Sequence, residues 1–364
     1  MVADRGNRLP NEGLTALNEA GLMNVSFSGN EESLGLSVGD FASIISKIGE
    51  HCLSTAFIYL QHCQQLALLK EHVYDSQREL VEEIIESGEW IGSVTTQKEK
   101  GGDLLRVNPP LVYENDMVRV RREAPVVGYA EAAGWFLVTM RTGVDSPENQ
   151  VSLVAIHKSD LGVSIKGEWN ALGMRGTQSL PMNFNVQISK ERVIKADFRM
   201  IALKTMIPFA HVGWAASWYG GARGVYDRFL DTIKRDRKCY KSELFRNRMA
   251  SIRLELDQMK AFLDSVTRDL DEARERNVDL SFYGDPTFNI KINNLKIGLA
   301  KSSFKVVSEL IEYMGLARGY FVEDEHFAER VFRDLKAAAL LYHNDRLLEA
   351  NGKLMLIEGR NLFG

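Results

Sequence analysis

The sequence has few cysteines and no long apolar run. Its three cysteines, Cys52, Cys63 and Cys239, stand at spacings that fit no pair of metal ligands, and no histidine accompanies them in a zinc pattern. We therefore expect free thiols and no metal site. No stretch approaches the ~18 uninterrupted apolar residues of a membrane helix, and the first residues lack the apolar core of a signal peptide. These absences predict a cytoplasmic protein that does not enter a membrane.

An excess of positive charge is also missing. The formal net charge is −4 over 364 residues, so no overall field favours nucleic acid or an anionic membrane surface. With 45% hydrophobic and 26% charged residues, the composition is that of an ordinary globular protein. We expect no nucleic-acid partner, and the length suits one large domain or two to three small ones.

Three blocks of different periodicity divide the chain. Residues 1–88 have the three-and-four spacing of helices, residues 89–200 contain short β-rich runs between turn residues, and residues 201–364 return to helical spacing. Strands confined to one block argue against alternating βαβ units, and no G-x-G-x-x-G opens a helix. The pattern predicts an α+β, mostly α fold: an N-terminal helical domain, a middle antiparallel β-barrel or sandwich, and a C-terminal four-helix bundle.

The bundle prediction rests on apolar stripes that alternate steps of three and four residues. A helix with such a stripe packs nearly parallel or antiparallel to its neighbours. A fourth helix is expected at about 325–341. The first three stripes are Val212, Ala215, Tyr219, Ala222, Tyr226, Phe229 and Ile233; Met249, Ile252, Leu256, Met259, Leu263, Val266, Leu270 and Ala273; and Ile297, Ala300, Phe304, Val307, Ile311 and Met314.

The most distinctive motif is G-M-R-G-T at residues 173–177, which follows Trp169. Other motifs stand around it in a fixed order. They are V-T-T-Q-K-E-K-G-G-D at 94–103, P-V-V-G-Y at 125–129, R-K-C-Y at 237–240, M-G-L-A-R-G-Y at 314–320 and E-R-V-F-R-D at 329–334. Together they resemble the acyl-CoA dehydrogenase superfamily of flavoenzymes, whose three-part fold has the same order.

The resemblance implies a bound FAD and a flavin loop at 94–103. It assigns Val94, Thr95, Gly101 and Gly102 to cofactor binding. A strand end brings backbone N–H groups and the Thr95 hydroxyl against the isoalloxazine ring, and paired glycines let the backbone pass close to it. Thr96 and Gln97 stand where the superfamily usually has Glu and Pro.

The resemblance places Val126 and Gly128 at the other face of the flavin. An aromatic residue and a threonine are common at these positions in the superfamily. Arg237, with Tyr240, matches the arginine motif that holds the FAD diphosphate, a role that suits a guanidinium fork. Gly315 lies in the turn that contacts the adenine end of a neighbouring subunit's FAD. The resemblance thus implies a homodimer or homotetramer.

The usual catalytic glutamate is absent. The superfamily places this base in one of two positions, which fall here on Tyr342 and Trp214. The Asp and Arg that commonly engage the thioester and CoA fall at about Val212 and Ala215. Groups that could act instead are His211, Tyr219, Tyr342 and His343, because a neutral His accepts a proton and a Tyr donates a hydrogen bond. Tyr342 and His343 are the preferred catalytic candidates, since they occupy the position of the glutamate.

Three hypotheses for function follow. The first is an FAD-dependent oxidoreductase that desaturates an acyl-type substrate held as a CoA or carrier-protein thioester and passes electrons to an electron-transfer protein. The second is a two-component monooxygenase that hydroxylates a small molecule with O2 and FMN or another reduced flavin from a flavin reductase. The third is a flavin-free pseudoenzyme. The lack of a glutamate at both positions favours the monooxygenase over the desaturating oxidoreductase. The strand and loop motifs favour the desaturating oxidoreductase.

Overall fold

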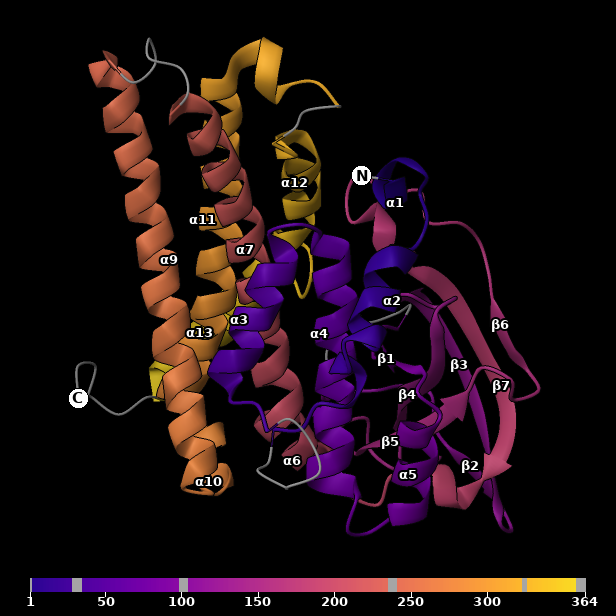
Figure 1. Ribbon diagram of the computed structural model, residues 1–364. Coiled ribbons are helices and arrows are strands. Elements are labelled where there is room, and N and C mark those ends of the chain that lie inside the picture. The colour runs from indigo at the N-terminus through magenta and orange to yellow at the C-terminus, as the bar shows by residue number, and fades with distance from the viewer. Residues whose placement is uncertain (1, 28–34, 98–103, 235–240, 323–325, 358–364) are drawn as a thin grey trace. The chain divides into compact units, whose positions relative to one another are not determined.

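The computed structural model describes residues 2–27, 35–97, 104–234, 241–322 and 326–357. The chain divides into two compact units (Figure 1). The first, here called the β-unit, comprises Met1–Leu36, Ile58–Asn170 and Arg175–Ala210. The second, the helical unit, comprises Ser37–Phe57, Ala171–Met174 and His211–Gly364. These units interleave along the chain, and the three-domain division at residues 88 and 200 stays a prediction.

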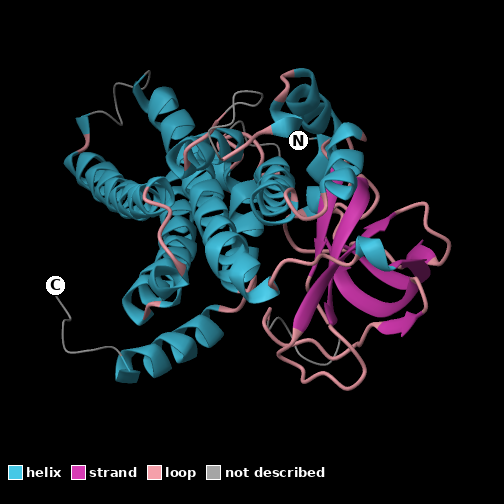
Figure 2. Cartoon of the chain, turned by 90° about the horizontal axis from the view of Figure 1, so that it is seen from below, coloured by secondary structure: helices cyan, strands magenta, loops and turns pink. Residues whose placement is uncertain are grey.

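The β-unit combines strands with short helices (Figure 2). Its strands are β1 (Trp90–Val94), β2 (Val112–Glu114), β3 (Met117–Val127), β4 (Ala133–Arg141), β5 (Val151–His157), β6 (Val163–Ile165) and β7 (Leu180–Ser189). Its helices are α1 (Val2–Arg5), α2 (Asn11–Glu19), most of α4 (Leu53–Leu68), α5 (Arg78–Glu86) and α6 (Phe198–Ile201). Strands β2 and β6 have three residues each and were not predicted from the sequence.

Two sheets make up the strand part of the β-unit, one in the order β1-β4-β5 and one in the order β2-β3-β7-β6. The prediction of antiparallel pairing holds for all described strand pairs except one. Strand β1 runs parallel to β4, with Val94 opposite Val138. Strands β2 and β3 intervene between them in sequence, so the chain returns to β1's side of the sheet by a long crossover, as parallel pairing requires.

The core of the β-unit lies between these sheets. Every second residue is buried along β7 and along most of β3, the period of a strand with one face in the core. Strand β4 is buried at eight successive positions because it is the central strand of its sheet. The core thus fixes the ends of β1 and β3, where the predicted flavin segments begin.

The helical unit consists almost entirely of helices. They are α3 (Val38–Gly49), the start of α4, α7 (Ile207–Lys234), α9 (Glu243–Glu275), α10 (Leu280–Gly284), α11 (Pro286–Gly319), α12 (Ala328–Leu335) and α13 (Asn344–Ile357). Helix α11 packs against α9, α12 and α13. The predicted mostly helical α+β fold is confirmed.

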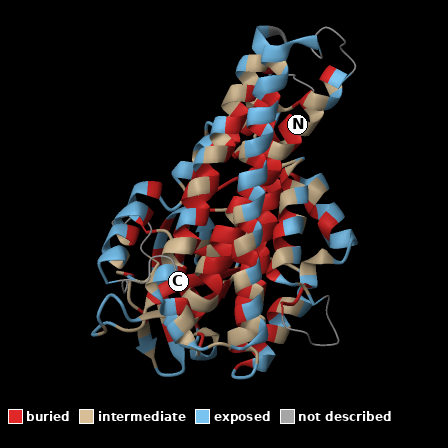
Figure 3. Cartoon of the chain, turned by 90° about the vertical axis from the view of Figure 1, so that its left-hand side faces the viewer, coloured by how far each residue is buried: buried red, intermediate tan, exposed pale blue. Residues whose placement is uncertain are grey.

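Burial in the helical unit follows the predicted stripes closely for two helices. All seven predicted positions on α7 and all eight on α9 are buried. In Figure 3, exposed residues run along the outward side of α9 while buried residues lie behind it. Helix α11 differs, since Phe304 and Ile311 are only half-buried whereas Leu295, Leu299 and Leu310 are buried outside its predicted stripe. A helix with neighbours on several sides buries more than one stripe.

The fourth predicted helix is interrupted. The prediction of a continuous helix over about 325–341 was wrong, because α12 ends at Leu335 and a 3-10 turn, Lys336–Ala339, follows it. Tyr342 then has a positive φ of 44°, which ends any regular helix before α13 begins at Asn344. This break places Tyr342 in a turn instead of on a helix face.

Candidate functional site

The end of β1 lies beside the end of β3 within the β-unit. The Thr96 hydroxyl donates a hydrogen bond of 2.8 Å to the Val126 carbonyl oxygen. Two segments that the sequence assigned to opposite faces of a flavin are therefore neighbours in space. Val94 is buried in the core, Thr95 is half-buried, and Val126 is 43% exposed. The Val126 side chain is thus the most exposed part of this segment, whereas the carbonyls of residues 94–96 already accept hydrogen bonds from Thr139 and Arg122.

A buried arginine, which sequence reasoning did not identify, holds the same backbone. Arg122 on β3 is 2% exposed and donates a hydrogen bond of 2.8 Å to the Thr96 carbonyl oxygen. Gln97, which replaces the usual proline, donates to the Arg106 carbonyl at 2.6 Å and accepts from the Asn108 amide at 3.2 Å. A proline has no side-chain amide and could make neither bond. The presence of Gln97 in place of proline was therefore the feature of the sequence that could have indicated these contacts. Gly101 and Gly102 lie outside the described residues.

The turn after β3 is held from two sides. Tyr129 has a positive φ of 42°, and its hydroxyl donates to the Ile91 carbonyl oxygen at 2.6 Å. Its backbone amide donates to the Thr177 carbonyl oxygen at 2.7 Å, which connects this turn to the G-M-R-G-T motif. Burial raises the pKa of the Tyr129 phenol. Gly128, next to this anchor, is half-buried in a fixed backbone.

The G-M part of that motif belongs to the helical unit and contacts the E-R-V-F-R-D motif. The Met174 amide donates to Asp334 Oδ1 at 2.5 Å, and Arg333 Nη1 donates to the Leu172 carbonyl oxygen at 3.1 Å. A Cβ atom on Gly173 would lie 2.1 Å from the Arg333 carbonyl oxygen, so only glycine fits. The close contact between residues 172–174 and 333–334 thus explains why both motifs, 160 residues apart, need these residues.

The two preferred catalytic candidates differ in their surroundings. The Tyr342 ring lies 6.2 Å from the ring of His211, centroid to centroid. The His343 side chain is 48% exposed, and its Nδ1 accepts a hydrogen bond from the Asp345 amide at 3.3 Å. Its carbonyl oxygen accepts from the Arg346 amide at the start of α13. The structure therefore brings Tyr342 to His211, while His343 caps a helix.

Lys296 lies under the Tyr342 turn, and sequence reasoning missed it. Its side chain on α11 is fully buried, and Nζ donates to the Ala338 carbonyl at 3.0 Å, the Tyr342 carbonyl at 3.3 Å and Asn344 Oδ1 at 2.7 Å. Burial lowers the pKa of Lys296 to about 7. No carboxylate among the described residues forms an ion pair with it. The Lys296 Nζ thus holds the backbone that presents Tyr342.

Aromatic side chains from α7 lie beside this lysine and Tyr342. His211, 3% exposed, has its ring 5.7 Å from that of Trp214, and the Trp214 and Trp218 rings stack at 6.5 Å. Lys296 Nζ lies 5.6 Å from the Trp218 ring centroid, within cation–π distance. Here we call His211, Trp214, Trp218, Lys296 and Tyr342 the α7 cluster.

The cluster differs chemically from a carboxylate base. Burial, together with the charge of Lys296, lowers the pKa of His211 to about 3. The imidazole is therefore neutral at pH 7, but it is too weak a base to remove a proton efficiently. Tyr219, the remaining candidate from the sequence, accepts a hydrogen bond from Arg223 Nη1 at 3.0 Å. The cluster can accept and donate hydrogen bonds and stack on a flat ring.

The chain is similar to known proteins along nearly its full length. It is 22% identical over 338 residues to the short-chain-specific acyl-CoA dehydrogenase of Clostridium acetobutylicum, covering 92% of this chain and 86% of that protein. The structure matches butyryl-CoA dehydrogenase from Megasphaera elsdenii with a TM-score of 0.83 at 14% identity, over 97% of this chain and 92% of the other. The chain has the fold of the acyl-CoA dehydrogenase superfamily. The resemblance predicted from the motifs is confirmed.

Other solved structures with the acyl-CoA dehydrogenase fold differ in what their names describe. The prolyl acyl carrier protein oxidase AnaB matches with a TM-score of 0.82 at 14% identity, over 97% of this chain and 93% of that one. FMN-bound TdsC from Paenibacillus sp. A11-2 matches with a TM-score of 0.84 at 17% identity, over 97% and 92%. No protein-family model matches the chain. At these identities the structures establish the acyl-CoA dehydrogenase fold alone.

The remaining residues predicted from the superfamily motifs have mixed outcomes. Gly315 interrupts α11 with φ 64° and ψ −173°, a conformation that favours glycine. Arg237 and Tyr240 lie outside the described residues. Cys52 and Cys63 are free thiols. Among the described residues no group of His, Cys, Asp and Glu side chains is arranged to hold a metal, and no described helix is long and apolar enough to cross a membrane.

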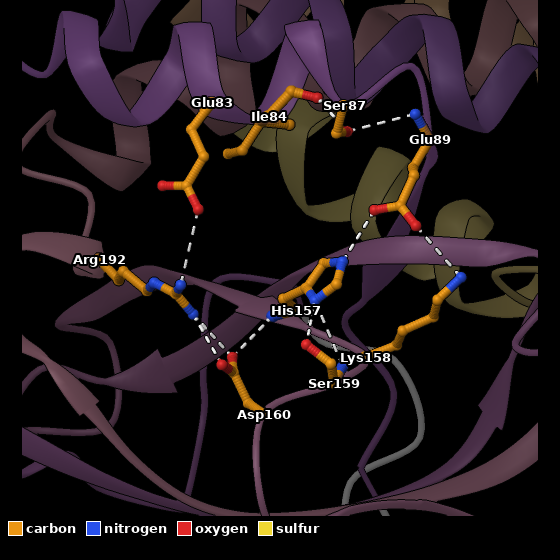
Figure 4. A network of polar contacts seen from close by, with 9 residues as sticks. All are labelled: Glu83, Ile84, Ser87, Glu89, His157, Lys158, Ser159, Asp160 and Arg192. Atoms are coloured by element: carbon orange, nitrogen blue, oxygen red, sulfur yellow. Dashed lines mark hydrogen bonds and ion pairs between the residues drawn. The ribbon is translucent and has the colours of Figure 1, made fainter.

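A polar network on the β-unit was also absent from the predictions (Figure 4). Glu89 accepts from His157 Nε2 at 2.8 Å and pairs with Lys158 Nζ at 3.2 Å. Arg192 pairs with Asp160 at 2.7 Å and with Glu83 at 3.7 Å. These contacts join the end of α5 and the start of β1 to the turn after β5. Their arrangement is that of a structural clamp.

We expect Glu89→Gln to lower the free energy of unfolding by about 1 kcal/mol at pH 7. Burial alone would raise the pKa of Glu89, but hydrogen bonds from His157 and Lys158 outweigh it and hold this pKa below its usual range. A carboxylate with a depressed folded pKa stabilises the protein above its unfolded pKa, and this contribution is lost as the pH falls through the folded value. Urea unfolding of both proteins should therefore show a gap that closes below about pH 4.5.

Glu83→Gln is the matched control for this prediction. Glu83 is 55% exposed and lies 3.7 Å from Arg192, so its removal should change stability by less than about 0.5 kcal/mol. A gap for Glu89→Gln that stays constant with pH would contradict the role of its charge.

Proposed function

We propose that this chain is an FAD-dependent oxidoreductase that oxidises an acyl-type substrate held as a CoA or carrier-protein thioester. The observation that carries the proposal is the hydrogen bond between Thr96 and Val126, which unites the two flavin segments of the superfamily motif. The sequence similarity to an acyl-CoA dehydrogenase over 92% of the chain supports the same class of reaction. AnaB, by its name an oxidase of a carrier-protein-bound prolyl group, supports the carrier-protein form of the substrate.

The residues of the β-unit fit a flavin. The backbone after Val94 is fixed by Arg122 and by the Thr96 hydroxyl, so its amide groups are held in place for a planar ligand. Val126, an apolar side chain 43% exposed beside them, gives the flavin ring a surface to cover. We propose that Val94, Thr95, Val126 and Gly128 contact the flavin. When bound, the flavin accepts a hydride from the substrate.

Five further cofactor contacts stay proposals that rest on the motifs. Gly101 and Gly102 would allow the loop to approach the flavin, Arg237 with Tyr240 would hold the diphosphate, and Gly315 would lie near the adenine of a neighbouring subunit. Arginine suits a diphosphate because its fork donates two parallel hydrogen bonds.

For catalysis we propose that Tyr342 donates a hydrogen bond to a substrate oxygen. Its ring belongs to the α7 cluster, and the residue is 37% exposed, so we propose that its hydroxyl reaches a ligand. His343, 48% exposed, stays the alternative proton acceptor at the position of the usual glutamate. The Tyr342→Phe and His343→Ala variants separate the two roles by their effects on turnover.

A second candidate function is supported by the chemistry of the α7 cluster. Desaturation of a thioester needs a base at the substrate α-carbon, yet the two glutamate positions hold Trp214 and Tyr342, and the neighbouring His211 is a weak base. A monooxygenase that uses reduced flavin, FAD or FMN, with O2 needs no such base. This alternative takes its reduced flavin from a flavin reductase, and TdsC, solved with FMN and indole, has the same fold.

We expect the purified protein to show the absorption bands of oxidised flavin. A substrate of the first reaction should bleach these bands under nitrogen, because hydride transfer then needs no oxygen. Binding of reduced flavin only, with turnover that requires O2 and a reductase, would favour the monooxygenase. Failure to bind FAD, FMN or chemically reduced flavin would leave only the flavin-free pseudoenzyme.

Partners and location are proposals of the same kind. The first reaction requires an electron-transfer protein that reoxidises the flavin. We propose a homodimer or homotetramer, since large apolar side chains follow Gly315 at the end of α11, with Leu316 73%, Tyr320 71% and Phe321 62% exposed. We propose a cytoplasmic protein, and sedimentation at micromolar concentration tests the oligomer.

A further inference from the structure

Two nitrogen atoms of the α7 cluster have no protein partner. His211 and Trp214 stand three residues apart on α7, so their side chains share one face of the helix. No described residue hydrogen-bonds to His211 Nδ1 or Trp214 Nε1, although both atoms are shielded from solvent. A buried polar atom without a partner costs free energy, and folded proteins keep few of them.

The two nitrogens have opposite hydrogen-bonding roles. The Ile292 backbone raises the pKa of the His211 ring, as a carbonyl oxygen close to a ring N–H does, and Nδ1 is the ring nitrogen without a hydrogen-bond partner among the described residues. Because burial keeps this imidazole neutral, the nitrogen that donates to a backbone carbonyl carries the ring's single proton. Nδ1 is then an acceptor, whereas the Trp214 indole N–H can only donate. A group that both donates and accepts through one atom satisfies the pair, and a hydroxyl is the simplest such group.

The surrounding rings define what the hydroxyl is attached to. The Trp214 and Trp218 rings are inclined by 19°, and the Tyr342 ring lies at 60° to His211. Aromatic walls of this kind favour a flat ring by offset stacking and edge-to-face contacts. Tyr342, 37% exposed, and the half-buried Trp214 are the members of the cluster with surface exposed to solvent.

We propose that His211 and Trp214 bind the hydroxyl group of a phenol-type ring on the substrate. The phenol O–H donates to His211 Nδ1, and its oxygen accepts from Trp214 Nε1. The ring itself packs against the indole rings and Tyr342. Only the description of this ligand as a substrate rests on the proposed oxidoreductase function, and the binding itself does not.

Three small aromatic probes that differ in the hydrogen bonds they can make separate the two interactions. The probe 4-methylphenol can donate and accept, 4-methylanisole can only accept, and toluene can do neither. We expect each hydrogen bond to tighten binding several-fold, so that 4-methylphenol binds roughly tenfold or more tightly than toluene, with 4-methylanisole between them. Dissociation constants from ligand-detected NMR titration of the purified protein measure this order.

Two variants assign the bonds to their residues. The His211→Leu variant should bind 4-methylphenol and 4-methylanisole equally, because it removes the acceptor. The Trp214→Phe variant should bind 4-methylanisole and toluene equally, because it keeps a ring but removes the donor. Circular dichroism and the melting temperature show whether each variant is folded, and the Trp214 pair of measurements stands if the His211 variant is not.

Equal binding of all three probes by the unchanged protein would overturn the proposal and indicate that water satisfies the two nitrogens. The titration measures binding and does not need flavin. A protein that shows no flavin-dependent activity but still binds the probes in the expected order would therefore contradict the proposed reaction and support this binding site.

Discussion

The Lys296→Met variant should lose about 3 kcal/mol of unfolding free energy at pH 6. Methionine fills a similar volume but cannot donate, so the carbonyls of Ala338 and Tyr342 and the Asn344 side chain lose their donor in a buried place. An acceptor left without a partner inside a protein costs more than an unformed surface hydrogen bond. Chemical unfolding followed by circular dichroism measures the loss.

The same comparison should depend on pH in a defined direction. Burial lowers the pKa of Lys296 to about 7, from the 10.5 that is usual for a lysine. Between these values the folded protein binds fewer protons than the unfolded chain, so the stability of the unchanged protein rises with pH. Relative to Lys296→Met, we expect it to gain about 2 kcal/mol between pH 7 and pH 9.

Lys291→Met is the control on the same helix. Lys291 pairs with Asp269 but is 32% exposed, so its loss should cost less than about 1 kcal/mol. A difference between Lys296→Met and the unchanged protein that stays flat from pH 7 to pH 9 would show that the lysine has an ordinary pKa.

Helices could be predicted from the sequence wherever a helix buries a single face. Met249 and Ala273, the first and last members of the α9 stripe, are both buried, as are all the members between them. Helix α11 was predicted less well because it packs against α9, α12 and α13. Its extra buried positions include Lys296, which a stripe analysis assigns to the surface because a lysine usually lies there.

The candidate site was predictable only in part, for a related reason. Thr95 and Val126 were predicted because each stands in a motif that is contiguous in sequence. The partners of Lys296 are backbone carbonyls and one amide, and carbonyls are present at every residue. No residue pattern shows where the chain reverses to bring them to a lysine more than 40 positions earlier. The positive φ of Tyr342 belongs to the same turn and also had no sequence signal.

The Gly220→Ala variant should lose about 2–3 kcal/mol of unfolding free energy. Helices α3 and α7 touch backbone to backbone at this point: a Cβ on Gly220 would lie 2.0 Å from the Ser46 carbonyl oxygen. One turn further, a Cβ on Gly224 would lie 2.6 Å from the Glu50 carbonyl oxygen. Backbone atoms cannot rotate away as a side chain can, so the helices must separate.

The helix propensity of alanine makes this a sharp test, because it acts in the opposite direction. In an exposed helix interior, replacing glycine by alanine stabilises by up to about 1 kcal/mol. Gly298→Ala on α11 isolates this gain, since nothing lies within 4 Å of a Cβ built there. We therefore expect the melting temperature to rise for Gly298→Ala and to fall for Gly220→Ala. A higher melting temperature for both variants would contradict the close backbone contact between α3 and α7 at Gly220 and Ser46.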